Sequence, residues 1–404
     1  MPVAVPATAK HSAAVPAKAG RRPRQLAAAR GIRYADVRTT KRKAQPVISY
    51  EGRNRRTVNY LKTLYFDRPE WTPCNIYFLP ATWMRHRKAL EDLVLAHPRL
   101  GPGFQKGKTE FDRVASPLYE RGRHTDCWGC VWDNIEPGMD SAPVAHPLQD
   151  WAALETLRIP DPVKDDQFGP RPPWDEVRRG MDAARARGDL AAGGGLPHGF
   201  MYMRLYYLRG FQNLMIDMAT DDPRLRRLIE IVEGYNTPVI RQYVALGAEI
   251  MQFGDDLGHQ KALPMGPALW RQFIKPSYDR MLRPCRERDI PVYLHTDGHI
   301  VEIIPDLIET GVRIVNPQIR ANGLDGLRRV ARGKVCIDQD LDRQLFPFAT
   351  PRQVEDHVGE VFEGLYLKKG GLMLVAECGP DVPLANIEAI CRTFERLCKP
   401  PENA

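Results

Sequence analysis

The stretch PVYLHTDGH, residues 291–299, shows most clearly how the chain is organised. Its first half is apolar and suits a buried β-strand, and its second half is polar and contains a glycine, as loops that follow strands do. Side chains two positions apart on a strand point the same way, so His295 and Asp297 are expected to face one site. The alternative is a His–Asp hydrogen bond that only shapes the loop.

Similar strands alternate with amphipathic helices over roughly the last 200 residues, which predicts parallel strands joined by right-handed crossovers. The helices are apolar on one side only, so a closed (β/α)₈ TIM barrel is favoured over an open doubly wound sheet. Strands are predicted at residues 72–79, 190–196, 249–253, 292–294, 313–315, 334–337 and 371–376. An eighth strand is expected between residues 110 and 210.

The basic charge of the chain is concentrated near its N-terminus. Residues 1–56 hold 14 Lys and Arg against two acids, whereas the whole chain carries only +8. We therefore expect a disordered basic extension over residues 1–53 and a barrel over residues 54–400, which does not bind nucleic acid. The chain has no apolar run long enough to span a bilayer, and its eight cysteines are sparse. These features predict a cytoplasmic protein with reduced thiols and no membrane association.

Polar side chains follow the predicted strands, and in a barrel all these strand ends meet at one rim. They are Asp255, Asp256, His295, Asp297, Asn316, Asp338, Asp340, Glu377 and Cys378, and His198 and His259 also follow strands. Helix capping is an alternative explanation, particularly for Asp338 and Asp340. Imidazole, thiolate and carboxylate together suit Zn²⁺, so His295 and Cys378 predict a metal site that Asp297 could complete.

The segment Cys127-Trp128-Gly129-Cys130 has the spacing of redox and metal motifs. Its aromatic neighbours predict a strand, on which the two sulfur atoms would point to opposite faces. We therefore expect a structural role for this segment.

Several motifs resemble the uroporphyrinogen decarboxylase (URO-D) superfamily, in the branch that includes cobamide-dependent methyltransferases. They are FDRPE (66–70), DCWG (126–129), RGFQNL (209–214), GDDLG (254–258), HTDG (295–298) and DVPLANI (381–387). The resemblance covers about residues 54–397 and implies a (β/α)₈ barrel. The substrate-binding motif of true porphyrinogen decarboxylases is replaced by YFLPATWMR (77–85).

The methyltransferase branch binds zinc through a His-x-Cys motif and a later cysteine. His295 and Cys378 match this pattern, while Asp297 replaces the middle cysteine. A carboxylate is a harder ligand than a thiolate, which better suits polarising an oxygen, as in demethylation of a methyl ether or a methanol-like donor.

The resemblance implies an enzyme that moves a methyl group between a small molecule and a corrinoid (a cobalamin-type cofactor) on a partner protein. Asp255 or Asp256 would bind substrate or act as base, with Glu377 beside them or as a further ligand. Asn316, His198 and His259 are candidate substrate-binding residues. The alternatives are a metal-free decarboxylase of the uroporphyrinogen decarboxylase type and a non-catalytic corrinoid or metabolite binder.

Overall fold

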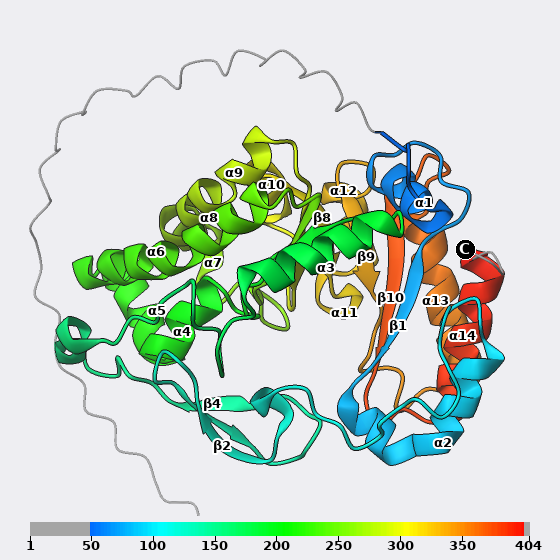
Figure 1. Cartoon of the computed structure of the whole chain (residues 1–404), viewed down its shortest axis with the longest axis horizontal. Helices are drawn as coiled ribbons and strands as arrows, with labels where there is room; N and C mark the ends of the chain where they lie inside the picture. Colours follow the sequence, from blue (N-terminus) through cyan, green and yellow to red (C-terminus); the bar gives the residue numbers. More distant parts are fainter. Residues whose placement is uncertain (1–48, 400–404) are drawn as a thin grey trace, which may run out of the picture. The chain divides into compact units, whose positions relative to one another are not determined.

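A curled parallel sheet forms the centre of the protein, as the computed structural model of residues 49–399 shows (Figure 1). Its seven strands follow the order β1 (Cys74–Phe78), β10 (Leu372–Cys378), β9 (Cys336–Asp340), β8 (Val312–Pro317), β7 (Val292–Thr296), β6 (Ile250–Gly254) and β5 (Ala192–Gly193). All seven predicted strand positions are confirmed. The predicted extension over residues 1–53 falls almost wholly outside the described residues.

The sheet departs from the prediction in one respect, because the described residues contain no eighth barrel strand between β5 and β1. The segment where that strand was expected forms a separate antiparallel sheet of β2 (Gly122–Thr125), β3 (Val131–Asn134) and β4 (Ala142–Ala145). The side chain of Asn54, the N-cap of α1 (Arg55–Leu64), ties the start of that helix to the loop before β5, because it donates hydrogen bonds to the Arg187 carbonyl at 3.1 Å and to Asp189 at 2.6 Å.

Helices surround the sheet (Figure 1). They are α1 (Arg55–Leu64), α2 (Pro80–Ala96), α3 (Trp174–Ala186), α4 (Tyr202–Arg209), α5 (Phe211–Thr220), α6 (Pro223–Ala245), α7 (Gly266–Leu269), α8 (Lys275–Met281), α9 (Arg283–Glu287), α10 (Ile304–Thr310), α11 (Ile319–Asn322), α12 (Leu324–Val330), α13 (Pro351–Leu365) and α14 (Leu384–Cys398). A π-helical turn at Trp270–Ile274 joins α7 to α8, and two 3₁₀ turns lie at Pro117–Tyr119 and Trp151–Thr156.

The helices dock through one apolar face each. On α13 the buried residues include Val354, Val358, Val361 and Leu365, whose spacing places them along one side of the helix. Strand β10 is almost wholly buried, as expected for a parallel strand covered on both faces. Within residues 49–399, no helix combines the length and apolar character that crossing a membrane would need.

Candidate metal centre

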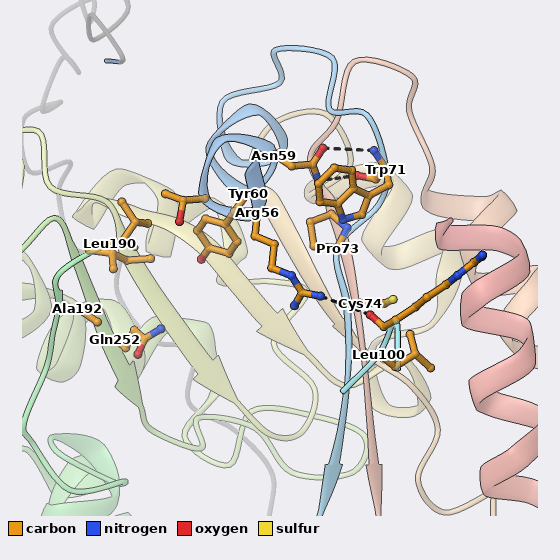
Figure 2. A pocket seen from close by; sticks show the side chains of 13 residues that line it. Arg56, Asn59, Tyr60, Trp71, Pro73, Cys74, Leu100, Leu190, Ala192 and Gln252 are labelled. Carbon is orange, nitrogen blue, oxygen red and sulfur yellow. Dashed lines mark hydrogen bonds between the residues drawn. The ribbon is translucent and has the colours of Figure 1, made fainter. Parts of the chain in front are cut away.

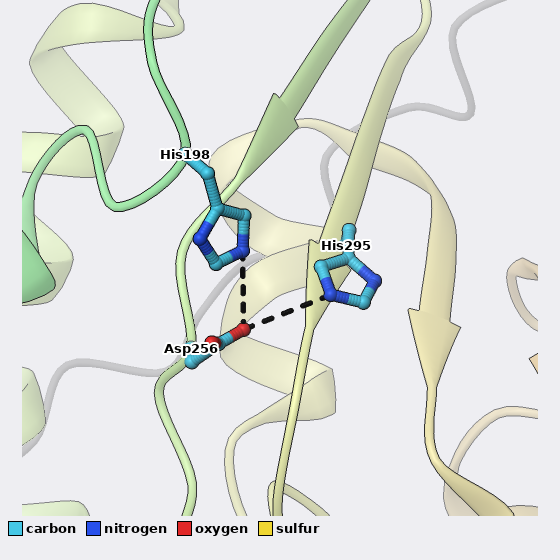
Figure 3. A group of neighbouring side chains, drawn as sticks. All are labelled: His198, Asp256 and His295. Carbon is cyan, nitrogen blue, oxygen red and sulfur yellow. Dashed lines mark ion pairs between the residues drawn. The ribbon is translucent and has the colours of Figure 1, made fainter. Parts of the chain in front are cut away.

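Three side chains meet where β5, β6 and β7 end, and we call them the rim cluster: His198, Asp256 and His295 (Figure 3). Asp256 Oδ1 lies 3.3 Å from His198 Nε2 and 3.7 Å from His295 Nε2. One ligand atom from each residue lies within 4.8 Å of the other two. Two imidazole nitrogens and a carboxylate oxygen at this separation form a donor set that can hold a divalent metal ion.

A hydrogen bond to Asn316 on β8 orients His295. The distance from His295 Nδ1 to Asn316 Oδ1 is 2.6 Å, and the Asn316 amide nitrogen donates to the Asp338 carbonyl at 2.6 Å. Because that second bond requires the nitrogen of the Asn316 amide, its oxygen faces the ring and accepts from Nδ1–H. The lone pair of His295 therefore resides on Nε2, directed at the rim cluster, which is how metal-binding histidines are commonly held.

His198 reaches the cluster because the neighbouring strand ends in glycine. A Cβ atom on Gly254 would lie 2.4 Å from Cδ2 of His198. The main-chain N–H of Gly199 donates to the Gly254 carbonyl at 2.8 Å and fixes the loop after β5 against β6. Burial would lower the pKa of His198, but the hydrogen bond and charge of Asp256, with Asp255 and Asp297, raise it to about 9.

Asp297 flanks the rim cluster. Its Oδ1 lies 3.3 Å from His295 Nε2 and, although buried, has no hydrogen-bond partner, while Oδ2 pairs with Arg343. Arg343 also contacts Glu377 at 2.6 Å, so it bridges two of the predicted site residues. Burial and the negative charge of Asp256 raise the pKa of Asp297.

Asp255 and Asp256 are adjacent in sequence but have different surroundings. Asp255 is fully buried and accepts hydrogen bonds from the N–H groups of Tyr202 and Met203, at 2.7 and 2.9 Å, and from the Tyr278 hydroxyl at 2.8 Å. Burial raises the pKa of Asp255 to about 6. Asp255 thus anchors the start of α4, whereas Asp256 faces the rim cluster.

The structure does not place Cys378 beside His295, contrary to the predicted ligand set. Neighbouring side chains on a strand point to opposite faces, and Glu377 points to Arg343 on the inner side of β10. The thiol of Cys378 therefore faces outward; its burial, with Cys391 on α14 nearby, raises its pKa. Of the described residues, His198, Asp256 and His295 form the metal-capable group, without Cys378.

The other predicted residues lie around two cavities. His259 stacks on Phe211, with ring centroids 5.2 Å apart, and lines a cavity of about 570 Å³ together with Asp297 and Arg343. His198 and His295 line a different cavity of about 700 Å³ inside the curled sheet, which also contains Asp338. Asp338 lies on β9 and faces this interior, so it does not cap a helix.

Comparison with known proteins identifies the family. A sequence model described as uroporphyrinogen decarboxylase (URO-D) matches residues 134–397, well over half of the chain. The chain belongs to the uroporphyrinogen decarboxylase family. This confirms the resemblance that the motifs indicated. Among curated proteins, none matches the chain.

Solved structures support the fold of this URO-D family member. A methyltransferase from Methanosarcina mazei superposes with a TM-score of 0.54 at 16% identity, covering 84% of this chain and 98% of that one. A putative vitamin-B12-independent methionine synthase from Listeria monocytogenes gives a TM-score of 0.35 at 15% identity, with coverage of 55% and 68%. At 16% identity, the first likeness indicates a shared fold and nothing more. The TM-score of the second structure is too low to support an argument about the fold.

Proposed function

We propose that this URO-D family member is a metal-dependent methyltransferase that moves a methyl group between a small substrate and a corrinoid on a partner protein. The observation that carries the proposal is the rim cluster, in which Asn316 leaves Nε2 of His295 free to bind a metal ion. The cluster opens onto a cavity of about 700 Å³, which has room for a small organic substrate.

The residues present fit a divalent metal ion such as Zn²⁺. His198 and His295 would each offer Nε2, and Asp256 would offer Oδ1. Oδ1 of Asp297 is buried without a partner beside His295, so a positive charge at the cluster would relieve an unsatisfied acceptor. When bound, such an ion acts as a Lewis acid toward a substrate oxygen.

The donor set favours a substrate whose methyl group is attached to oxygen. The structure brings two imidazoles and a carboxylate together and leaves the thiol of Cys378 outside the group. A site without thiolate ligands keeps more positive charge on the metal and suits oxygen better than sulfur. A methyl ether or a methanol-like donor is therefore the proposed substrate type.

Asp297 is placed to supply the proton that the departing oxygen needs. Its free Oδ1 lies 3.3 Å from His295 Nε2. Arg343 pairs with the other oxygen of Asp297 and holds the carboxyl group in place. The reduced corrinoid would supply the electron pair that accepts the methyl group. Its place on a partner protein is proposed from the family resemblance.

A metal-free decarboxylase is the second candidate, and one observation favours it. The pKa of His198 is raised to about 9, so its imidazolium could donate a proton to the carbanion that loss of CO₂ leaves. A substrate with many carboxylates would nevertheless need several cations. Among the described residues, the inner cavity is lined by a single Lys or Arg side chain, that of Arg56.

The two candidates separate in a chelation experiment on the full chain. Methyl transfer from methanol and from a methyl ether to free cob(I)alamin would be measured before and after metal removal, and in His295→Ala. The proposal expects a loss of about 100-fold or more in both cases, with Cys378→Ser as an active control. Transfer that survives chelation would contradict it, and uroporphyrinogen turnover by the chelated protein would establish the second candidate.

A further inference from the structure

One carboxylate inside the curled sheet lacks a cationic partner. Asp338 lines the same cavity as His198 and His295, and its Oδ2 accepts a hydrogen bond of 3.1 Å from the Tyr293 hydroxyl. In the described part of the chain, no Lys, Arg or His forms an ion pair with it. A carboxylate that faces a cavity without an ion-pair partner favours a positive group from elsewhere.

Three tyrosine rings share the cavity with Asp338, and they come from different elements: Tyr60 from α1, Tyr77 from β1 and Tyr293 from β7. The Tyr293 hydroxyl contacts Asp338 directly, and burial and then the charge of Asp338 raise the pKa of Tyr77. Aromatic faces beside a carboxylate form a surrounding that attracts organic cations.

The cavity has room for such a ligand and continues toward the unclosed edge between β5 and β1. A second cavity of about 350 Å³ lies there and shares Arg56, Tyr60, Cys74 and Gln252, among others, with the first (Figure 2). The Arg56 guanidinium donates a hydrogen bond to the Arg99 carbonyl at 3.5 Å.

We propose that the substrate carries an ammonium group, which binds between Asp338 and the tyrosine rings while its methyl-bearing oxygen faces His198, Asp256 and His295. The substrate class is thus an O-methylated amine. The assignment of the methyl-bearing end rests on the proposed function, whereas the preference for a cation rests on Asp338 alone. Asp338 follows Asn316 and His295 across the sheet, so one compact molecule can contact both parts.

Calorimetric titration of the full chain with three matched ligands tests this proposal. They are 4-methoxyphenethylamine, 4-methoxyphenethyl alcohol and 4-methoxyphenylacetate, which are cationic, neutral and anionic at neutral pH. The wild type should bind the amine about tenfold or more tightly than the alcohol, and the anion weakest. Asp338→Asn should remove the preference, and Asp325→Asn, which removes an exposed charge, should keep it.

Tyr77→Leu provides a second variant at a partly exposed ring and should weaken amine binding about two- to fivefold. The proposal would be overturned if the amine and the alcohol bound equally or the anion bound most tightly. It would also be overturned if no ligand bound to the folded protein, or if Asp338→Asn kept the preference for the amine. Titrations with chelated protein separate the two claims. If the protein prefers the cation but transfers no methyl group, this inference stands and the proposed function fails. If it transfers methyl groups only from neutral donors, the proposed function stands and this inference fails.

Discussion

Two polar clusters of this protein are built around an aspartate, yet their surroundings differ. In the first, Asp126 accepts from the N–H groups of Trp128 and Cys130 at 3.0 and 2.9 Å, from the Trp132 indole at 3.1 Å and from Arg204 at 2.8 Å. Donors from the protein satisfy both carboxylate oxygens of Asp126. We call this group the Asp126 cluster.

The rim cluster is incomplete by comparison. Its two imidazoles present Nε2 to Asp256, and the neighbouring Asp297 has an unpartnered oxygen. The Cys-x-x-Cys segment belongs to the Asp126 cluster, where the Cys130 thiol contacts the Tyr207 carbonyl at 3.3 Å. The comparison shows that a motif with metal spacing can be structural, while scattered residues form the site that can still take a ligand.

The largest effect is expected from opening the Asp126 cluster. Arg204→Met leaves a buried carboxylate without its counter-charge, so the free energy of unfolding should fall by about 3–5 kcal/mol. Urea unfolding measures this loss. Metal content per folded chain should stay unchanged, because Arg204 is not part of the rim cluster. Arg87→Met, which breaks an exposed pair with Asp112, is the control and should unfold as the wild type does.

Gly254→Ala should damage the rim cluster without unfolding the chain. The added methyl group would displace His198, which is exposed enough to move, so metal affinity should fall about 10–100-fold. Competition with a chromophoric chelator gives the affinity. Gly234→Ala on α6 is the matched control, because its Cβ would contact nothing within 4 Å. Equal affinities for both variants would remove His198 from the site.

Asn316→Ala should have a smaller effect on the same cluster. Without the Asn316 oxygen, the His295 ring loses its orientation, and metal affinity should fall about tenfold. The chelator competition would be repeated with Asn213→Ala, a partly buried asparagine on α5 that lies outside the rim cluster, as the control. A wild-type affinity in Asn316→Ala would show that His295 needs no support from β8.

The smallest effect concerns His97, which contacts Glu388 at 2.9 Å and Glu395 at 3.0 Å. Burial would lower its pKa, but the two glutamates raise it above the ordinary value of 6.5. Its stabilising contribution is therefore complete below pH 6.5 and is lost as the pH rises through the raised pKa. Compared with His97→Gln, the wild type should be more stable by about 1 kcal/mol at pH 6, and this difference should shrink by pH 9.

Strand and helix positions were largely predictable, because apolar periodicity alone marks buried strands such as Val292–Thr296. The side chains at strand ends were less predictable. A shift of one residue reverses the face, and sequence alone did not tell that Glu377 points inward and Cys378 outward. His198 and Asp256 were both candidates, but their side chains can approach each other only because Gly254 has no side chain. Arg343 was missed, although it follows the polar end of β9.

Metal analysis of four purified proteins tests whether the rim cluster holds a metal ion: the wild type, His198→Ala, His295→Ala and Cys378→Ser. We expect about one zinc or similar divalent ion per chain in the wild type and in Cys378→Ser, and little in either histidine variant. A wild type without metal would contradict this expectation. So would a Cys378→Ser protein that loses its metal while His198→Ala keeps it.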